Sequence, residues 1–365
     1  MKIALVHDML TQNGGAERVL QAFHEIWPEA PIYTLIYNQK KAGKFFKEQE
    51  IKTSFLQKIP GSKNKYQWYL ILMPQATESF DLSQYDLVLS SASALIKGVR
   101  VKSPSLHICY CHTPTRYLWS DAGSYLEHLP YSRIVKSILP PVLNHIRSWD
   151  YQAARKVDQF IANSQTVQGR IKKYYQRDSE IIYPPVDVNN FYLTSGVAKK
   201  YFLIGGRLVA YKKYDLAVKA FSKLNLPLKV FGVGPELKLL KKLAGPRIEF
   251  LGEISDEKKK ELFANAQAFI NPQEEDFGIT AVESLASGRP VIAYRAGGAT
   301  EIIKEGMSGL FFEEQTWEAL ADSIIHFKSS DFNPLAIKQE SLKFDTSIFK
   351  HKISDYLGKI FKNKV

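Results

Sequence analysis

The stretch that most constrains the fold covers residues 271–301, NPQEEDFGITAVESLASGRPVIAYRAGGATE. It follows the apolar run 266–270, which predicts a buried strand, and it continues with an acidic turn and a helix. Gly288 and Pro290 are a typical helix stop, and the apolar residues 291–294 predict the next strand. Such a strand–turn–helix–strand unit is typical of α/β folds that bind phosphate at helix N-termini. We therefore expect an α/β protein.

Two glutamates stand in this stretch, Glu275 in the turn and Glu283 within the helix. Ile279, Val282 and Ala286 share one face of the helix, and Glu283 lies on the same face. A carboxylate on an apolar face is unfavourable without a partner. The partner is either a cation of the protein core or a hydroxyl group of a bound sugar. Spacing alone favours the core ion pair.

The two glutamates, the Phe-Gly pair between them and the segments SLASGRPVIA and GGATEII resemble the retaining glycosyltransferases of family 4. These enzymes have the GT-B fold, in which two Rossmann-like doubly wound domains face a central cleft. The resemblance implies that Glu283 binds the ribose hydroxyls of a sugar nucleotide and that Glu275 lies beside the donor sugar. It also implies that the backbone amides of Phe277, Gly278 and Ile279 hold the sugar and the diphosphate.

The length of 365 residues fits two domains better than one. The sequence Pro-Pro-Val-Asp at residues 184–187 resembles the family's junction between domains. We therefore expect an acceptor-side domain at 1–186 and a nucleotide-sugar domain at 187–345. In GT-B enzymes a final helix crosses back onto the first domain, and we expect this of residues 346–365. Strand and helix patterns alternate in both halves, which favours mostly parallel sheets.

The composition, 45% hydrophobic and 24% charged, is that of an ordinary globular protein. The apolar run before His7 is too short for a signal peptide or a membrane span. Cys109 and Cys111 lie on a predicted strand and are expected to be reduced thiols. These features lead us to expect a cytoplasmic protein.

A basic segment at residues 40–72 interleaves lysines with aromatic and aliphatic residues, in a chain of formal net charge +12. Such a segment is suited to peripheral contact with anionic lipids, here at the inner face of the plasma membrane. A solvated basic face fits the pattern equally well. Nucleic acid ranks last, because no binding motif accompanies the charge.

Two stretches of the first domain carry candidate site residues. Gly14 and Gly15 follow the first predicted strand and begin a helix, so their amides could approach an anion, and the sequence GGAERV is similar to the family's loop at the cleft. His112 directly follows a predicted strand, and its sequence, HTPTRYLW, resembles the family's His-x-Pro element, whose histidine contacts the donor sugar. Within the family, the sequence HTPTRYLW most resembles that of bacterial mannosyltransferases of O-antigen and exopolysaccharide assembly. Residues 132–149 either line an acceptor surface or form a kinked core helix.

The second domain begins with a strand followed by Gly-Arg-Leu and two lysines. Arg207 and Lys212 beside a predicted helix start favour a diphosphate, and they match the family's Gly-Arg-Leu…Lys element. Lys213 stands where many members have glycine. The turn at Gly232 corresponds to the one that contacts the nucleotide base. Because the chain has no Asp-x-Asp motif and offers these cations, we predict activity without a metal or other cofactor.

The sequence thus predicts a retaining glycosyltransferase, with Glu275, His112, Arg207 and Lys212 as its catalytic residues. It would move a sugar, mannose from GDP-mannose by the HTPTRYLW resemblance, to a hydroxyl of a glycan or lipid-linked oligosaccharide in cell-surface polysaccharide synthesis. A UDP-sugar donor is the alternative within the same reaction. A GT-B epimerase, a non-catalytic sugar-nucleotide sensor and a membrane-surface scaffold are the other readings.

Overall fold

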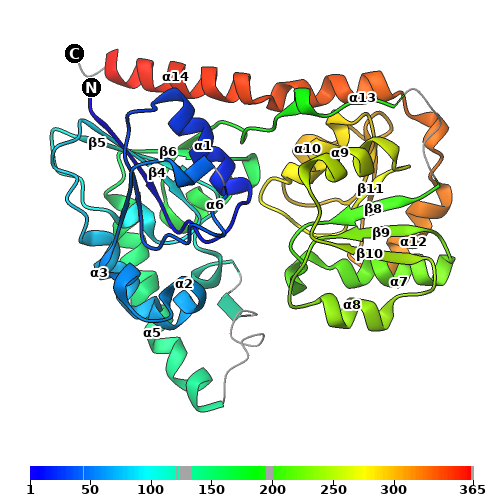
Figure 1. Cartoon of the computed structure of the whole chain (residues 1–365), viewed down its shortest axis with the longest axis horizontal. Helices are drawn as coiled ribbons and strands as arrows, with labels where there is room; N and C mark the ends of the chain where they lie inside the picture. The colour runs from blue at the N-terminus through cyan, green and yellow to red at the C-terminus, as the bar shows by residue number, and fades with distance from the viewer. Residues whose placement is uncertain (44, 121, 124–132, 195–199, 363–365) are drawn as a thin grey trace. The chain divides into compact units, whose positions relative to one another are not determined.

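The computed structural model describes residues 1–43, 45–120, 122–123, 133–194 and 200–362, with the backbone alone at 133–138. The chain divides into two compact units, shown in Figure 1. The first comprises Met1–Pro184 together with Lys350–Val365, and the second comprises Pro185–Phe349. Each unit is a parallel sheet with helices packed on it.

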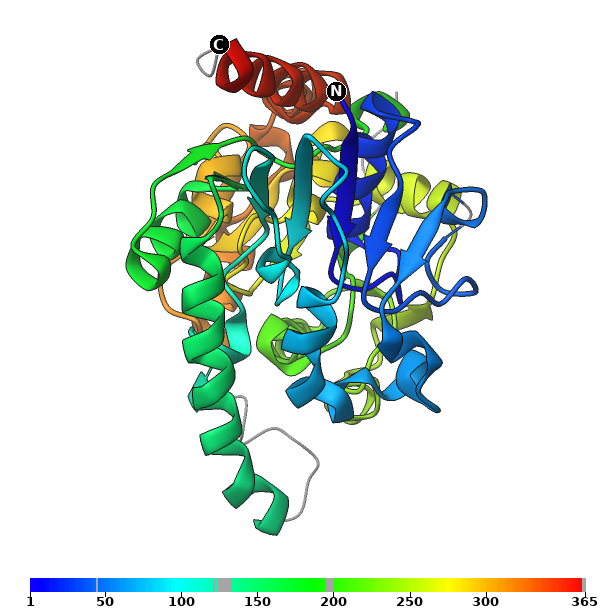
Figure 2. The same ribbon diagram turned by 90° about the vertical axis from the view of Figure 1, so that its left-hand side faces the viewer.

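In the described part of the first unit, seven parallel strands form one sheet in the order β3-β2-β1-β4-β5-β6-β7. The strands are β1 (Ile3–His7), β2 (Ile32–Thr34), β3 (Ile51–Thr53), β4 (Leu87–Ala92), β5 (Leu106–Cys111), β6 (Gln159–Ala162) and β7 (Ser179–Ile181). The central strands are near-continuous apolar runs because both faces of a parallel sheet are covered. Figure 2 shows these strands side by side.

The helices of this unit are α1 (Gly15–Ile26), α2 (Ser62–Lys65), α3 (Met73–Glu78), α5 (Arg133–Arg155), α6 (Gln165–Tyr175) and most of α14 (Thr346–Lys362). The 3-10 turns are η1 (Phe45–Lys47), η2 (Phe55–Lys58), η3 (Tyr66–Leu72), η4 (Ile96–Gly98) and η5 (Arg116–Leu118). Helix α1 buries Val19, Leu20 and Phe23 on one face. Lys350 of α14 forms an ion pair of 2.6 Å with Glu25 of α1.

In the described part of the second unit, six parallel strands follow the order β10-β9-β8-β11-β12-β13. They are β8 (Phe202–Gly205), β9 (Leu228–Phe231), β10 (Ile248–Gly252), β11 (Phe269–Asn271), β12 (Val291–Tyr294) and β13 (Gly309–Phe312). The sheet is buried at its centre, where Leu203, Ile270 and Ile292 are inaccessible to solvent.

Helices cover both faces of this second sheet (Figure 1). The helices are α7 (Tyr214–Leu224), α8 (Leu237–Leu243), α9 (Asp256–Asn265), α10 (Ile279–Ala286), α11 (Ala299–Ile302), α12 (Trp317–His326) and α13 (Pro334–Ser341). The 3-10 turns are η6 (Val188–Asn190), η7 (Ala210–Lys212), η8 (Ser329–Asp331) and η9 (Leu342–Phe344). Helix α7 lies beside α8 and α12, whereas α10 lies beside α9 and α13. None of the described helices is both long and apolar enough to span a bilayer.

The apolar run 32–37 is strand only over Ile32–Thr34. Beyond it, Tyr37 pairs with Leu10 in an isolated bridge, and its backbone also bonds the Gln57 side chain. Helix α5 is one continuous helix that contains Pro140 and Pro141. It includes most of the segment 132–149 for which an acceptor surface or a kinked core helix was expected, but residue 132 and the side chains of 133–138 lie outside the described residues.

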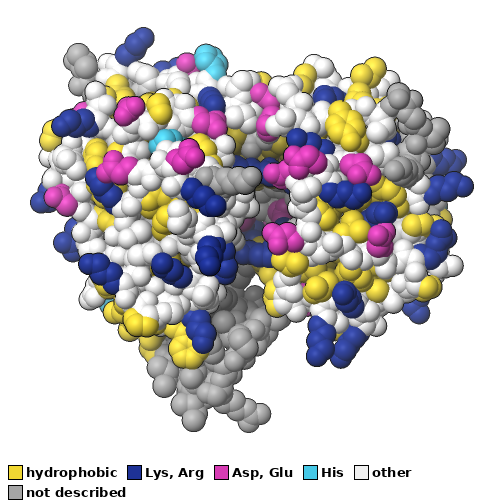
Figure 3. Space-filling model, in the orientation of Figure 1, with side chains coloured by type: hydrophobic (Ala, Val, Ile, Leu, Met, Phe, Trp, Pro, Cys, Tyr) yellow, Lys and Arg dark blue, Asp and Glu magenta, His cyan; other side chains and the backbone are white. Residues whose placement is uncertain are grey.

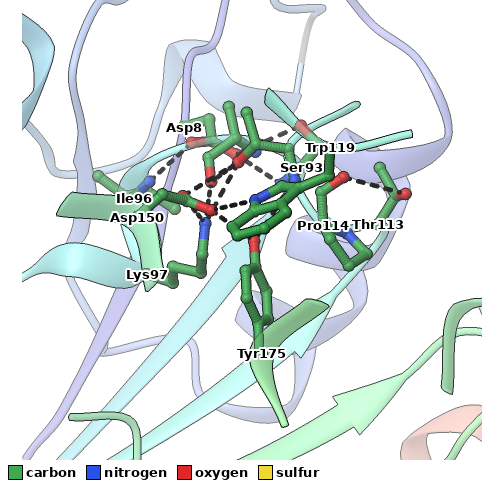
Figure 4. A network of polar contacts seen from close by, with 11 residues as sticks. Asp8, Ser93, Ile96, Lys97, Thr113, Pro114, Trp119, Asp150 and Tyr175 are labelled. Carbon is green, nitrogen blue, oxygen red and sulfur yellow. Dashed lines mark hydrogen bonds and ion pairs between the residues drawn. The ribbon is translucent and has the colours of Figure 1, made fainter. Parts of the chain in front are cut away.

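A buried carboxylate fixes the segment that follows β5 (Figure 4). Asp150 of α5 is inaccessible to solvent and forms an ion pair with Lys97, whose side chain is equally buried. The Trp119 ring nitrogen and the Tyr175 hydroxyl each donate a hydrogen bond of 2.8 Å to Asp150, and the Thr115 hydroxyl donates one of 3.2 Å. Residues 115–119 are thereby attached to α5 and α6.

This network generates a stability prediction. Asp150→Ala should lower the free energy of unfolding by about 3–5 kcal/mol, because it leaves the Lys97 ammonium buried without its counter-ion. Asp178→Ala removes a carboxylate that also pairs with a lysine, Lys172, but with its side chain 91% exposed, and should leave stability nearly unchanged. Urea unfolding of both variants is the measurement. An equal loss of unfolding free energy in the two variants would contradict the stabilising role of the buried Asp150–Lys97 pair.

Candidate functional site

The turn after β11 places Glu275 against a lysine from another loop. Lys212, the last residue of η7, forms an ion pair of 2.8 Å with Glu275, and the two side chains are 13% and 15% exposed. Burial disfavours the charged lysine, but the carboxylate of Glu275 outweighs it and raises the pKa of Lys212 above its ordinary value. The pair is therefore a largely buried cation and anion at the carboxyl edge of the sheet.

Backbone contacts from two glycines hold this turn in place. The amide of Gly298 donates a 2.9 Å hydrogen bond to the Glu275 carbonyl. A Cβ atom on Gly297 would lie 2.3 Å from that carbonyl oxygen, and one on Gly298 would lie 2.2 Å from the carbonyl oxygen of Phe277. The GGATE segment is thus packed so closely on the turn that no side chain fits at these two positions.

Helix α10 begins directly after the turn. Gly278 has φ +111°, a conformation that favours glycine, and no side chain caps the helix. The Phe277 ring is buried against Phe344, with ring centroids 5.4 Å apart, and Ile279 is the first helical residue. The first-turn N–H groups of an α-helix have no intrahelical acceptor, so this helix start, beside Glu275, favours an anion.

Glu283 is buried on α10 and has a cation partner. Lys259 of α9, itself 17% exposed, forms an ion pair with the Glu283 carboxylate. The structure therefore shows the core ion pair that spacing favoured. Lys259 could not be recognised as the partner from the sequence, because α9 is weakly amphipathic and its three consecutive lysines give no sign of which one points inward.

Arg207 and Lys213 lie in the loop between β8 and α7. Arg207 is exposed and donates a 3.1 Å hydrogen bond to the Tyr211 hydroxyl. Lys213 is the N-cap of α7 and has φ +53°, a left-handed conformation that favours glycine. A glycine at this position would adopt that conformation without strain.

The loops after β8 and β9 interlock. A Cβ on Gly232, which has φ +105°, would lie 1.9 Å from the carbonyl oxygen of Gly206. The amide of Leu208 donates a 3.0 Å hydrogen bond to the carbonyl of Val233. In the second unit the structure thus brings the loop containing Arg207 and Lys212 next to the Gly232 turn, and Lys212 next to Glu275.

His112 follows β5 in the first unit and belongs to a set of polar groups that share one face of the sheet. Its Nε2 lies 2.8 Å from the Ser91 hydroxyl, which lies 3.1 Å from Nδ1 of His7. Burial, with a smaller contribution from His7, lowers the pKa of His112 to about 3. The His112 ring is therefore neutral at neutral pH.

Gly14 and Gly15 lie at the start of α1, as expected. The amide of Gly14 donates a 2.9 Å hydrogen bond to Oε2 of Glu17, so this amide has a partner within the protein. Oε1 of Glu17 lies 3.7 Å from Nε2 of His7. No sequence signal indicated Glu17, His7 and Ser91, because the strand register that brings them together is a tertiary property.

Among the described residues, no group of three or more His, Cys, Asp and Glu side chains is arranged to hold a metal ion. The two cysteines are buried thiols on β5, and burial raises the pKa of Cys109 to about 12.

The buried histidines generate a pH prediction. Burial lowers the pKa of His107 to about 4 from 6.5, so below pH 6.5 the unfolded chain binds more protons than the folded one. The free energy of unfolding should therefore fall as the pH drops from about 7 to 5. His107→Gln should make this pH dependence shallower. His326 has a side chain that is 73% exposed, so His326→Gln should leave the pH dependence unchanged. Urea unfolding across this pH range is the measurement, and an unchanged slope in His107→Gln would refute the prediction.

Two family models match adjacent parts of the chain. The model described as Glycosyltransferase Family 4 matches residues 13–190. The model described as Glycosyl transferases group 1 matches residues 190–343. The junction of the two matches lies close to the division between the two compact units.

Curated relatives match parts of their own length. A GDP-mannose-dependent alpha-mannosyltransferase from Corynebacterium glutamicum is 32% identical over 133 residues, which are 35% of this chain and 32% of the relative. The alpha-1,3/1,6-mannosyltransferase ALG2 of Dictyostelium discoideum is 26% identical over 281 residues, 63% of this chain and 64% of the relative. The chain thus spans less than two thirds of the length of these relatives.

A solved structure shares the fold over nearly the whole chain. HepE from Anabaena, in complex with UDP, is similar with a TM-score of 0.72 at 19% identity, over 98% of this chain and 100% of that one. The expected fold class is confirmed by this similarity and by the two parallel-sheet units. The two family models, both described as glycosyltransferases, together match residues 13–343 of this GT-B fold.

Proposed function

We propose that this protein transfers a sugar from a nucleoside diphosphate donor to a hydroxyl group, with retention of configuration at the anomeric carbon. The observation that carries the proposal is the ion pair of Lys212 and Glu275, which lies beside the uncapped start of α10. A cation, a helix N-terminus and a carboxylate in one place suit a sugar diphosphate, since the phosphates need positive charge and the sugar hydroxyls need an acceptor.

The leaving diphosphate would be stabilised by groups that the structure already holds in place. Negative charge grows on the diphosphate as the glycosidic bond breaks, and fixed cations and helix dipoles lower the energy of that charge. Arg207, Lys212 and the amides of Phe277, Gly278 and Ile279 supply this stabilisation in our proposal. Because these groups do the work of a metal ion, we propose that the reaction needs none.

Donor binding would change the partner of Lys212. In the structure the ammonium group is neutralised by Glu275. A diphosphate that binds Lys212 competes with that carboxylate and allows it to accept a hydrogen bond from the donor sugar. Glu283 would bind the ribose hydroxyls while it shares its carboxylate with Lys259. We assign the nucleotide base to the Gly232 turn and a contact with the donor sugar to His112.

The donor we propose is GDP-mannose. The HTPTRYLW sequence after β5 and the C. glutamicum relative, named for GDP-mannose, support it. The HepE structure contains UDP and supports a UDP-sugar as the second candidate. The acceptor in this proposal is a glycan or lipid-linked oligosaccharide of cell-surface polysaccharide synthesis.

We further propose that the basic segment 40–72 contacts an anionic membrane, where a lipid-linked acceptor would be presented. Trp68, Ile71 and Phe55 in this segment are 68%, 57% and 42% exposed, and Lys63 and Lys65 are exposed beside them. Exposed aromatic and aliphatic side chains among lysines suit a lipid headgroup region. Figure 3 shows Lys and Arg side chains on many parts of the visible face, with Asp and Glu among them.

Thermal unfolding with GDP, GDP-mannose, UDP and UDP-sugars, in EDTA, tests the donor site. A ligand at 100 times its dissociation constant should stabilise the protein by ~2.7 kcal/mol. We expect this shift with GDP and GDP-mannose, and its loss in Arg207→Ala.

Arg247→Ala is the matched control. Arg247 is also exposed in the second unit, but it precedes β10 and so lies at the amino edge of the sheet, where it donates to the Asn225 carbonyl. This variant should keep the shift. A shift with UDP compounds alone would move the proposal to the UDP-sugar donor, and no shift with any nucleotide would refute it.

A further inference from the structure

A line of polar side chains crosses one face of the first sheet beneath α1. Ser91 of β4 lies directly opposite His7 of β1 in the parallel register, and Tyr110, two residues before His112, lies opposite Ser91. Glu17 of α1 closes the line with Oε1 3.7 Å from Nε2 of His7. His7, Glu17 and Ser91 are each at most 2% exposed.

The hydrogen-bonding capacity of each group determines where the protons lie. Oε1 of Glu17 lies 3.7 Å from Nε2 of His7, beyond hydrogen-bond distance, and the negative charge of the carboxylate favours a proton on that nitrogen. With one proton on His7, carried by Nε2, its Nδ1 accepts a hydrogen bond from the Ser91 hydroxyl, 3.1 Å away. The Ser91 oxygen is left to accept, and Nε2 of His112, 2.8 Å away, must be its donor.

We propose that Glu17, His7 and Ser91 are positioning residues that hold His112 in the tautomer with its proton on Nε2. Nδ1 of His112 is then a hydrogen-bond acceptor for a hydroxyl group of the bound sugar. The sugar contact rests on the proposed function, whereas the tautomer does not.

This tautomer has a consequence for specificity. An Nδ1 atom without a proton accepts a hydrogen bond from a sugar hydroxyl, and it is left without a donor when that hydroxyl is missing. A site built to bond a hydroxyl discriminates strongly against the analogue that lacks it. Since His112 is neutral, it selects and orients the sugar and does not serve as a proton donor at neutral pH.

The chain supplies a matched control on the adjacent residue. Ser90 is buried like Ser91, and its hydroxyl lies 2.8 Å from Nε2 of His107. Successive side chains of a strand point to opposite faces, so this second serine–histidine pair lies on the other side of the sheet. Ser90→Ala therefore removes a comparable buried hydrogen bond without affecting His112.

The test is nitrogen NMR of protein labelled with ¹⁵N-histidine, in which the shifts of the two ring nitrogens report the tautomer. The His112 signals are assigned by their loss in His112→Gln. In the wild type at neutral pH we expect the proton on Nε2. In Ser91→Ala the population should shift towards Nδ1–H, because Nε2–H loses its acceptor. Ser90→Ala should leave the His112 signals unchanged.

Steady-state transfer supplies the second readout. Ser91→Ala should lower kcat/KM about tenfold, the effect of one lost buried hydrogen bond, with the affinity for the free nucleoside diphosphate unchanged. Ser90→Ala should retain wild-type kinetics. A proton on Nδ1 in the wild type, or identical His112 signals in Ser91→Ala and the wild type, would overturn the inference. The expected tautomer in a protein that transfers no sugar would support the hydrogen-bonded line and count against the proposed function.

Discussion

The ion pair between Lys212 and Glu275 joins two loops that belong to different strands of the second sheet. Because both side chains are largely buried, either charge alone would be strongly unfavourable, so the two loops depend on each other. Glycines in the surrounding backbone allow close packing around the pair. Gly297 and Gly298 pack directly on the Glu275 turn, and Gly278 starts α10 without a side-chain cap. A site assembled in this way holds its charges before any ligand arrives, which is the condition under which electrostatic stabilisation of a leaving group is most effective.

Much of the fold could be predicted from the sequence, because parallel strands that are buried on both faces are short apolar runs. The strand Val291–Tyr294 has the bounds that its apolar run indicated. Helices α8, α9 and α13 were not identified. Helix α9 has a long charged stretch in place of a clear apolar stripe, and α8 and α13 are only seven and eight residues long.

The positions of the candidate site residues in the chain were also predictable, but their partners were not. Spacing placed Glu283 on the inner face of α10, and a buried carboxylate requires a partner, yet nothing in the sequence indicated Lys259. The contact between Ser91 and His112 likewise depends on the register of β4 and β5, which local sequence does not determine. The roles of Glu275, Arg207, Lys212 and His112 stay predictions.

The measurement that tests the central claim most directly is release of nucleoside diphosphate during sugar transfer, in EDTA, by the wild type and by Lys212→Gln. Replacing the ammonium with a neutral group removes charge stabilisation of the leaving diphosphate. We predict activity in the wild type and a loss of about 100-fold or more in kcat for the variant. Wild-type kcat in Lys212→Gln, in a folded protein that transfers sugar, would contradict the account.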